Sequence, residues 1–378
     1  MLLSPEQITI RDTLRRYSRE RLRPTAGLRD QTRAFPHDEL AELAEMGLMG
    51  MLVPPDWNGA GLDYLSMAVV LEELAAGDGA LSTIVSVNNS VVCGPLLQFG
   101  SAEQKNTFLK PLAAGQKLGC FCLTEPQAGS DAGALRTRAT RKGNDYILNG
   151  SKQFITSGKN ADIAIVLAVT DQQAGKNGIS AFIVPTDSPG YVVAKLEEKL
   201  GQHCSDTAQV IFDDCHVPAA NRLGKAGDGY KIALANLEAG RIGIAAQSVG
   251  MARAAYECAL RYSKERESFG KKIFEHQAVA FRLAEMATQI EAARQLVWHA
   301  AALKDAAEPA LKQASMAKLF ASEMAEKVCS AAIQTLGGYG YLSDFPLERI
   351  YRDVRVTQIY EGTSDIQKLV ISRALENE

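Results

Sequence analysis

Apolar positions in the first third of the chain fall at helical spacing. A helix is expected to begin at Ser4, which forms a capping box with Gln7 and is followed by Pro5 at the first helical position, and to stop before Pro24. Further helices are expected near 36–47, at 66–76 and, after a second capping box, from Ser101. This part is therefore predicted to be a helical domain.

A different pattern occupies the middle of the chain, from about Gly119. Short runs rich in β-branched residues are bounded by glycine, proline and aspartate, with no long helical pattern between them. These runs lie at 146–148, 163–169, 179–184, 191–196 and 209–212. The pair Asn149-Gly150 follows the first run and is typical of a hairpin turn. A mostly antiparallel β domain is predicted.

After Gly229 apolar residues again recur at intervals of three and four. Three stripes, at 245–259, at 283–300 and at 316–328 with Phe320 included, predict long helices packed side by side. The predicted fold class is therefore multi-domain α+β. An N-terminal α-helical domain is expected at 1–118, a middle antiparallel, β-barrel-like domain at 119–228 and a C-terminal four-helix bundle at 229–378.

The composition narrows the class of protein without naming a reaction. The 378 residues are 46% apolar and 22% charged, as in a globular protein, and the 41 basic and 44 acidic residues give a net charge of −3. No nucleic-acid partner is expected, because such a partner usually requires a concentrated basic surface. No membrane span is expected either, since no apolar run was judged to reach the roughly 18–20 residues that a span needs.

The seven cysteines are odd in number and scattered, which predicts reduced, buried thiols in a cytosolic protein. No metal site is expected, because cysteines and histidines lack ligand spacing. The beginning of the sequence has no signal-peptide pattern, and its arginine-rich stretch at 11–33 also carries acidic residues, unlike a transit peptide. A cytoplasmic location is expected, or the mitochondrial matrix if a transit peptide has been removed.

Common nucleotide-binding motifs are missing. The sequence contains no G-x-x-x-x-G-K-[ST] loop, and no G-x-G-x-x-G follows a predicted strand. A nucleotide cofactor would therefore need another architecture. Three other segments combine polar residues with glycine: FCLTEPQAGSD at 121–131, SKQFITSG at 151–158 and IYEGTSDIQ at 359–367.

These segments resemble those of acyl-CoA dehydrogenases, and the resemblance covers essentially the whole chain, including the α–β–α order. Residues 123–131 are similar to the flavin-loop signature of the family, and 334–340 with 360–367 to its C-terminal signature. The likeness is greatest to the short-chain, butyryl-CoA type. It implies an FAD-dependent enzyme that converts a short-chain acyl-CoA to the trans-2-enoyl-CoA, with the α-proton going to a carboxylate and the β-hydride to flavin N5.

The resemblance implies that Glu361 is the catalytic base. In some branches of the family the base lies on a long C-terminal helix, at the position of Gly240 here, and glycine cannot accept a proton. Two influences on the pKa of Glu361 oppose each other. The sequence from Thr363 predicts a helix start, whose partial positive charge favours the carboxylate, whereas burial beside a flavin and an acyl chain would raise the pKa. The sequence leaves the outcome open.

The resemblance also implies which residues hold FAD and the substrate. Thr124 would bond the flavin ring, Phe154 would stack on it where many members have tryptophan, and Arg266 would pair with the pyrophosphate of a neighbouring subunit's FAD. The full cofactor set is Phe121, Leu123, Thr124, Gly129, Ser130, Phe154, Ile155, Thr156, Arg266, Phe269, Gln277, Gln334, Gly337, Gly338, Thr363 and Asp365. The substrate set is Ser130, Glu238, Arg241, Gln247, Thr357, Tyr360 and Gly362.

Within the substrate set, Arg241 is expected near the CoA adenine, beside Glu238 where the family usually has aspartate. Gln247 and Thr357 would cap a short acyl pocket, and Thr357 would lie one turn before Glu361 if that segment is helical. The implied partners are electron-transfer flavoprotein and three further copies in a homotetramer. The alternatives are a dehydrogenase of short, 2-methyl-branched acyl-CoA, an oxidase or monooxygenase on the same fold, and a non-catalytic relative.

Overall fold

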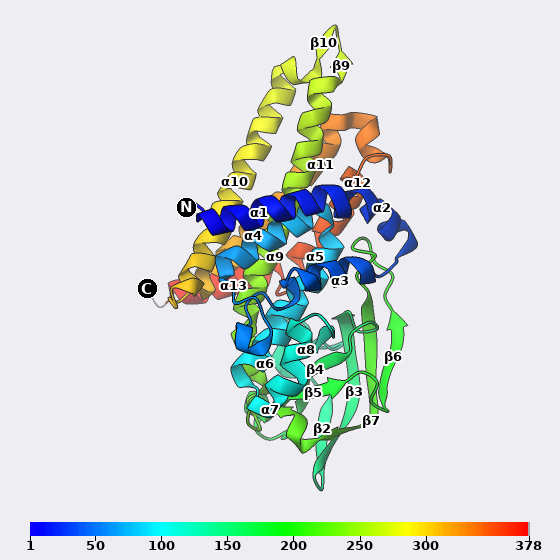
Figure 1. Cartoon of the computed structure of the whole chain (residues 1–378), viewed down its shortest axis with the longest axis vertical. Helices are drawn as coiled ribbons and strands as arrows, with labels where there is room; N and C mark the ends of the chain where they lie inside the picture. The colour runs from blue at the N-terminus through cyan, green and yellow to red at the C-terminus, as the bar shows by residue number, and fades with distance from the viewer. Residues whose placement is uncertain (377–378) are drawn as a thin grey trace.

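The computed structural model describes residues 1–376 and has the predicted order of helical, β and helical parts. In Figure 1 the β domain lies at one end of an elongated molecule, and two C-terminal helices reach to the other end. The first N-terminal helices cross between them, and the last three, α6 to α8, lie beside the sheet. The N-terminal helices are α1 (Pro5–Tyr17), α2 (Arg23–Thr32), α3 (His37–Glu45), α4 (Tyr64–Gly77), α5 (Gly79–Val87), α6 (Gly94–Phe99), α7 (Ala102–Gln104) and α8 (Lys110–Ala113).

The sequence predicts that the first helix stops before Pro24, but the chain stays helical past this residue. Instead α1 is followed by a π-helical turn, Ser18–Leu22, and then by α2, which contains Pro24 in its first turn. The N–H of Arg23 donates to the Ser18 carbonyl, five residues back. This wider turn accommodates a residue that has no N–H to donate, so the chain continues as helix. The expected capping box of Ser4 and Gln7 is confirmed.

The sequence predicts no apolar stretch long enough to span a membrane. One helical stretch does reach that length. Gly79–Phe99 is 21 residues long and has a mean hydropathy of 1.4, but 83% of its apolar window is buried inside the protein. Core helices of globular proteins pass the same test of length and composition. Asparagine, serine and glycine interrupt the apolar residues of this stretch, so it contains no long continuous apolar run, although none of its residues is charged.

The middle domain is a mixed sheet in the order β6-β7-β3-β2-β4-β5-β8, with β1 also paired to β4. The strands are β1 (Gly119–Cys122), β2 (Arg138–Lys142), β3 (Asp145–Thr156), β4 (Ile163–Val169), β5 (Ile179–Pro185), β6 (Tyr191–Leu196), β7 (Thr207–Pro218) and β8 (Arg222–Leu223). Most pairs are antiparallel as predicted, but β1 and β2 run parallel to β4. The order of the sheet has two ends, β6 and β8, so the antiparallel barrel-like description was only approximate.

The hairpin predicted at Asn149-Gly150 was wrong. Both residues lie inside β3, where the pairing register with β7 shifts between Leu148 and Gly150. The Asn149 amide and Asp214 exchange hydrogen bonds of 2.9 Å at this bulge, and a Cβ on Gly150 would lie 2.5 Å from Thr137 Oγ1. Glycine is therefore needed for close approach and not for a turn. The actual hairpin turn is 143–144, between β2 and β3.

The central strand β4 is buried on both faces. Ile163, Ile165 and Leu167 pack toward helices α6 and α8, whereas the alternate residues Ala164 and Val166 pack inside the β domain. Such two-sided burial explains why this strand is a continuous apolar run. One face of the sheet is thereby fixed to the N-terminal helices.

The C-terminal helices are α9 (Gly229–Glu265), α10 (Gln277–Asp305), α11 (Leu311–Leu336), α12 (Leu347–Val354) and α13 (Ser364–Leu375). The long helices α9, α10 and α11 pack side by side, and α4 joins them in one apolar core. A small hairpin of β9 (Glu267–Ser268) and β10 (Lys271–Lys272) connects α9 to α10 at the tip of the molecule (Figure 1). The predicted C-terminal helical domain is confirmed.

The third predicted stripe was only partly right. Met324 and Val328 are buried, but Phe320 is 40% exposed in this chain. The buried face of α11 instead contains Ala314, Lys318, Ala321 and Ala325, which share the spacing of three and four with Val328. Small side chains let α11 approach α9 closely, so alanines rather than large residues mark the packed face.

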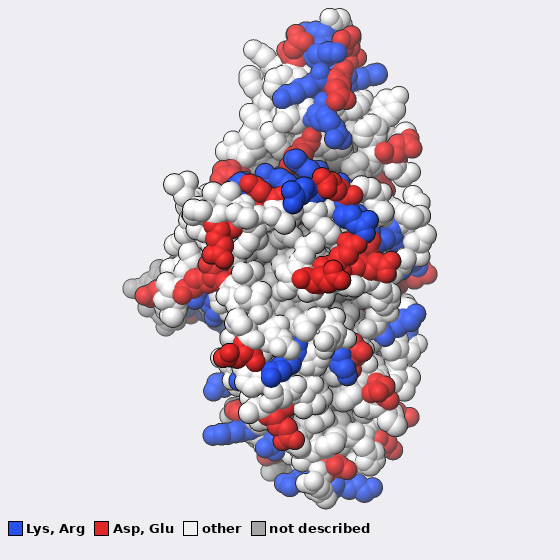
Figure 2. All heavy atoms as spheres, viewed as in Figure 1, with Lys and Arg blue, Asp and Glu red and all other residues white. Residues whose placement is uncertain are grey.

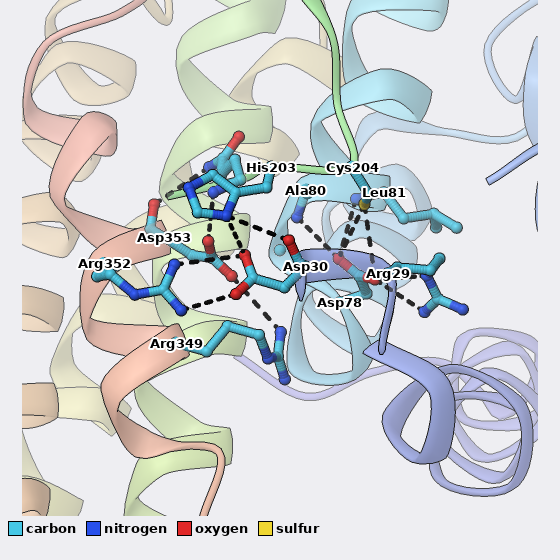
Figure 3. Close-up of polar contacts among 12 residues, drawn as sticks. Arg29, Asp30, Asp78, Ala80, Leu81, His203, Cys204, Arg349, Arg352 and Asp353 are labelled. Atoms are coloured by element: carbon cyan, nitrogen blue, oxygen red, sulfur yellow. Dashed lines mark hydrogen bonds and ion pairs between the residues drawn. The ribbon is translucent and has the colours of Figure 1, made fainter. Parts of the chain in front are cut away.

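A polar cluster joins the three parts of the chain (Figure 3). Asp30 of α2 pairs with Arg352 of α12 at 2.7 Å and with His203, from the loop between β6 and β7, at 2.9 Å. In the same loop the Gln202 N–H donates to Asp353 of α12. Burial raises the pKa of Asp353 to about 6, although the Arg349 guanidinium lowers it. The cluster fixes the loop and α12 against the N-terminal helices.

On the face shown in Figure 2, acidic and basic side chains lie in separate groups, several of them mixed, with uncharged areas between them. All seven cysteines are buried and free of disulfide bonds, which confirms the expectation of buried, reduced thiols. Residues 1–376 contain no group of three or more histidine, cysteine, aspartate or glutamate residues that could hold a metal ion.

Candidate active site

Glu361 lies in a tight turn between two helical segments. The 3-10 turn Arg355–Gln358 ends before it, and α13 begins after it with Thr363 as N-cap. Glu361 has a φ of 53° and Gly362 a φ of 88°, so two successive residues are left-handed. This conformation is strained for glutamate and persists only where the surroundings enforce it.

The segment from 357 to 361 is therefore not a continuous α-helix. Thr357 lies within the 3-10 turn, is fully buried, and donates its hydroxyl to the Val354 carbonyl at 2.7 Å. The condition under which Thr357 would lie one α-helical turn before Glu361 is not met. Because the backbone changes to left-handed values at Glu361, the relative positions of the Thr357 and Glu361 side chains do not follow from helical spacing.

Gly240 of α9 lies directly against the Glu361 carboxyl group. A Cβ at position 240 would lie 2.7 Å from Glu361 Oε2 and 2.9 Å from Cδ, closer than real Cβ contacts. The absence of a side chain therefore makes the space that the carboxyl group occupies. The two positions that the resemblance offers for a base thus meet in this structure, and Glu361 is the one with an acidic side chain.

Burial determines the charge of Glu361. It raises the pKa of Glu361 to about 7, while the Arg241 and Lys318 cations lower it and only partly offset the effect of burial. Oε2 is buried and has no hydrogen-bond partner within the described chain. Of the two influences considered from the sequence, burial acts as expected, and it outweighs the two cations, so the pKa lies above its ordinary value. A carboxyl group with a pKa near neutrality can accept a proton at physiological pH.

Two buried side chains hold the backbone of this turn, and sequence reasoning missed both in this role. Lys318 Nζ donates to the Gly362 carbonyl at 2.8 Å. Gln367 Nε2 donates to the Glu361 and Gly362 carbonyls at 3.1 and 2.9 Å. Lys318 could have been found by its spacing, because a lysine on a stripe of alanines is expensive to bury and therefore needs a partner.

Gln247 and Tyr360, both predicted to contact substrate, are in contact with each other. The Tyr360 hydroxyl donates to Gln247 Oε1 at 3.0 Å, and burial raises the pKa of Tyr360 to about 12. Gln247 is fully buried and its Nε2 has no partner among residues 1–376. Gln202, from the loop between β6 and β7, also donates to the Tyr360 hydroxyl, at 3.4 Å. Tyr360, the residue before Glu361, is thus linked through Gln202 to the polar cluster that joins the three parts of the chain.

The predicted adenine-side residues occupy the same helix as Gly240. Arg241 is buried, bonds Ser315 Oγ at 3.4 Å and leaves its Nε without a partner in the described residues. Burial lowers the pKa of Arg241, against the effect of Glu361. Glu238 forms an ion pair with Lys304 of α10. Arg241 therefore lies close enough to Glu361 to act on its charge, while Glu238 is engaged elsewhere.

The two middle-domain segments lie side by side. The Gln153 N–H of β3 donates to the Thr124 carbonyl at 2.8 Å, which joins the loop after β1 to the end of β3. Leu123 and Thr124 are half-buried on this loop, as is Phe121 in strand β1, whereas Gly129 and Ser130 are exposed. A Cβ on Gly129 would meet nothing within 4 Å, so the glycine is not required by the protein's own packing.

Phe154 has the features of a stacking surface. It is 63% exposed although it is a large apolar residue, and its φ of 60° places it in the left-handed region. Ile155, also predicted to contact the cofactor, points into the core of the β domain, so only its backbone is available. Thr156 at the end of β3 is half-buried.

A third group lies at the other end of the molecule. Arg266, Gln334, Gly337 and Gly338 line a surface hollow of ≈ 710 Å³ where α11 ends. Phe269, at the tip of the hairpin, is 94% exposed, and Gln277 is exposed at the start of α10. In Figure 1 this end is far from the β domain, so one chain does not bring these residues to Thr124. Nearer the site, Thr363 caps α13 and Asp365 is exposed.

Comparison with known proteins defines the class. Sequence models of the acyl-CoA dehydrogenase N-terminal, middle and C-terminal domains match residues 4–116, 120–215 and 227–376. The chain therefore belongs to the acyl-CoA dehydrogenase family and is an FAD-dependent oxidoreductase, which confirms the resemblance. The domain limits at 118 and 228 stay predictions.

Individual relatives are similar over nearly the whole chain. The mitochondrial short-chain specific acyl-CoA dehydrogenase of Rattus norvegicus is 47% identical and is matched over 96% of this chain and 88% of its own. The structure of butyryl-CoA dehydrogenase from Megasphaera elsdenii has a TM-score of 0.97 and 42% identity, covering 100% of this chain and 99% of its own. A chain from work on the electron transferring flavoprotein of Acidaminococcus fermentans has a TM-score of 0.98 and 46% identity, with 100% of both chains covered.

The residues present fit FAD. An exposed aromatic face at Phe154 suits a planar ring system, and the exposed Arg266 cation beside a hollow suits a pyrophosphate. The buried but unpartnered Ser157 Oγ lies at the end of the same 151–158 segment. These features meet the needs of a flavin nucleotide without any change to the chain's own packing.

Proposed function

We propose that this enzyme dehydrogenates a short, straight acyl-CoA of about the length of butyryl-CoA to the trans-2-enoyl-CoA, with Glu361 as base. One observation carries the proposal: in an acyl-CoA dehydrogenase, a carboxyl group with a pKa of about 7 lies beside Gly240, and its buried Oε2 has no hydrogen-bond partner among residues 1–376. Glu361 accepts the α-proton, and the β-hydrogen leaves with its electron pair. FAD, when bound, supplies the acceptor for that hydride.

Pocket residues and relatives both support the short chain. Gln247 and Thr357 are fully buried, and Tyr360 bonds Gln247. These side chains are proposed to limit the length of the acyl chain. A methylene group is worth only about 1–3 kcal/mol in such a pocket, so 2-methyl-branched substrates are the alternative to test. Arg241 and Glu238 are proposed to lie toward the CoA nucleotide, with Ser130 and Gly362 along the thioester arm.

The cofactor residues support a site shared between copies of the chain. We assign Phe121, Leu123, Thr124, Gly129, Ser130, Phe154, Ile155, Thr156, Thr363 and Asp365 to the FAD whose flavin lies beside Glu361. Arg266, Phe269, Gln277, Gln334, Gly337 and Gly338 lie at the other end of the molecule and are assigned to the FAD of a neighbouring copy. A homotetramer provides such neighbours, and its formation can be measured by sedimentation.

Electron-transfer flavoprotein is the proposed acceptor, supported by the family and by the chain similar to this one in work on such a flavoprotein. An oxidase or monooxygenase on the same fold is the alternative, and it would consume oxygen rapidly once reduced. The proposed location is the cytoplasm, or the mitochondrial matrix for a chain whose transit peptide has been removed, as the name of the rat relative includes that organelle.

Anaerobic reduction of the flavin by butyryl-CoA tests the proposal. The wild type should bleach, and Glu361→Gln should bleach at least about 10²-fold more slowly, the lower end of what a general base contributes. Equal rates for both proteins would exclude Glu361 as the base. A series of butyryl-, octanoyl- and 2-methylbutyryl-CoA should be fastest with the first; a different order would refute the chain-length assignment and leave the base untouched.

A further inference from the structure

A lysine is buried on the face of α11 that packs toward the catalytic turn. Lys318 is fully buried, and it shares the buried stripe of the helix with alanines. Its Nζ reaches the Gly362 carbonyl at 2.8 Å, the hydrogen bond that the described structure gives it. Burying an ammonium group is costly, so its retention needs an explanation beyond packing.

Hydrogen bonds to two successive carbonyls explain how the left-handed turn is kept. Gln367 donates to the carbonyls of Glu361 and Gly362, and Lys318 donates to that of Gly362 from the opposite element. Both donors are fully buried, so water does not compete for these carbonyls. A strained turn that carries the reacting group is thus defined by two side chains that never touch the carboxyl group itself.

Lys318 differs from Gln367 because it also carries charge. The charged and titratable groups that act on Glu361 are Arg241 from α9, with Glu238 nearby on the same helix, Lys318 from α11 and Tyr360 from its own segment. Arg241 and Lys318 both favour the carboxylate form. Burial lowers the pKa of Lys318 to about 8, opposed by Glu361 and assisted by Arg241, so the ammonium group is retained at neutral pH.

We propose that Lys318 is a positioning residue for the base: its ammonium group holds the Glu361 turn through the Gly362 carbonyl, and its charge keeps the carboxylate available to accept the α-proton. This rests on the proposed function of Glu361. Gln367 shares the first role but not the second. The two residues therefore form a matched pair, since each can lose its bond to Gly362 while only one loses a charge.

The test compares Lys318→Met, Lys318→Arg and Gln367→Met in the FAD-loaded enzyme. The rate of anaerobic flavin reduction by butyryl-CoA is measured from pH 5 to pH 10 for each. Removing a cation raises the pKa of a carboxyl group, so Lys318→Met should shift the acidic limb upward by about one pH unit and lower the rate at pH 7 about fivefold or more. Gln367→Met should lower the rate without moving the limb, and Lys318→Arg should restore the wild-type limb.

A second readout does not depend on turnover. Infrared difference spectra follow the protonated carboxyl band of Glu361 as pH is raised, with Glu361→Gln as the blank. The band of Lys318→Met should persist to higher pH than that of the wild type. If Glu361→Gln reduces as fast as the wild type, the proposed function fails, but this titration still reports whether Lys318 sets the charge of Glu361.

Controls separate positioning from stability. Ser322→Ala removes another buried polar group of α11, one that bonds only its own helix at Leu319, and should leave the pH profile unchanged. Lys318→Gln, which keeps a donor but not the charge, is the second variant if Lys318→Met does not fold. An unshifted limb and band in the variant that folds would overturn the proposal, as would failure of both variants to fold, because Lys318 would then be a structural residue.

Discussion

Two glutamates with buried carboxyl oxygens have opposite properties: Glu125 is buried as a whole, whereas Glu361 is half-buried with its Oε2 atom buried. Glu125, in the loop after β1, has a pKa of about 2: burial would raise it, but the charge and hydrogen bond of Lys152 and further hydrogen bonds outweigh burial. Glu361 has a pKa of about 7, because burial outweighs the two cations that act on it. The same side chain is thus a permanent anion at one position and a proton acceptor at the other.

The difference lies in the donors each carboxyl group meets. Glu125 Oε1 accepts from Lys152 Nζ at 2.7 Å and from the Thr137 N–H at 2.9 Å, and Oε2 accepts from the Arg136 N–H and Gln127 Nε2. Among residues 1–376 no such set surrounds Glu361, and its Oε2 has no hydrogen-bond partner there. Hydrogen bonds to the charged form stabilise it, so a fully bonded carboxylate loses its basicity.

The lysines beside the two glutamates show the same contrast. Lys152 binds the Glu125 carboxylate directly and also the Leu123 carbonyl at 3.1 Å. Lys318 bonds instead to the carbonyl of the residue after Glu361. A direct ion pair stabilises the fold, whereas a cation one residue away leaves the carboxyl oxygens free for chemistry. The Glu125–Lys152 pair is therefore an example of charge buried to stabilise the fold, and Glu361 with Lys318 an example of charge buried where a carboxyl group must react.

The largest expected effect comes from breaking the bonded pair. Lys152→Met leaves Glu125 buried without its cation and should lower the free energy of unfolding by about 3–5 kcal/mol. Urea unfolding monitored by circular dichroism measures the change. The double variant Lys152→Met with Glu125→Gln removes the uncompensated charge and should recover part of the loss. A single variant as stable as the wild type would show that the pair is not the support its geometry indicates.

A smaller effect is expected from filling the space beside the reactive carboxyl group. Gly240→Ala places a Cβ where Glu361 Oε2 is now only 2.7 Å away, so the carboxyl group must move. Displacement of a reacting group by about 1 Å can cost roughly 10²-fold in rate, and flavin reduction by butyryl-CoA should fall by about that factor. Gly338→Ala, at a glycine with open space around it, is not suitable as a control because it lies in the proposed cofactor set.

Gly143→Ala is the better control, since it lies in the β2–β3 hairpin turn with nothing within 4 Å of the added carbon. Its positive φ of 63° should cost some stability but no rate. If Gly240→Ala reduces its flavin as fast as this control, Glu361 tolerates displacement and the geometric argument is wrong.

Much of the fold followed from local pattern. The stripes at 245–259 and 283–300, the capping box at Ser4 and the run that became β4 depend on neighbours within a few residues, and each was found. Asn149-Gly150 and Pro24 were misjudged because long-range structure overrode a local signal. A partner strand with Asp214 turned the first into a bulge, and a π-helical turn admitted the second.

The site shows the same limit. Glu361 and the meaning of Gly240 were accessible through a family resemblance. Lys318 stood out only as a lysine on a stripe of alanines. Its role could not be predicted, since it depends on a carbonyl 44 residues away in the chain and on a left-handed turn that no residue pattern indicates. The charge state of Glu361 was likewise inaccessible, because it depends on how completely the folded chain excludes water.

The smallest expected effect is on the pH dependence of stability, where the two glutamates act in opposite directions. The folded pKa of Glu361, about 7, lies above its ordinary value of 4.5, so the folded state binds the proton more tightly and the stabilisation is full below 4.5 and lost as pH rises through 7. The folded pKa of Glu125, about 2, lies below that value, so its contribution is present above 4.5 and lost as pH falls through 2.

Glu361→Gln should therefore remove a fall in stability between pH 4.5 and pH 7 that is on the order of 2 kcal/mol in the wild type. Urea unfolding at pH 5 and pH 8, with a fixed excess of FAD, measures the difference between the two proteins. Asp353, whose pKa of about 6 gives a slope of the same sign, is present in both and cancels. If the wild type and Glu361→Gln lose equal stability over this range, Glu361 is already ionised at pH 5. The contrast with Glu125 would then lie in hydrogen bonding alone and not in charge.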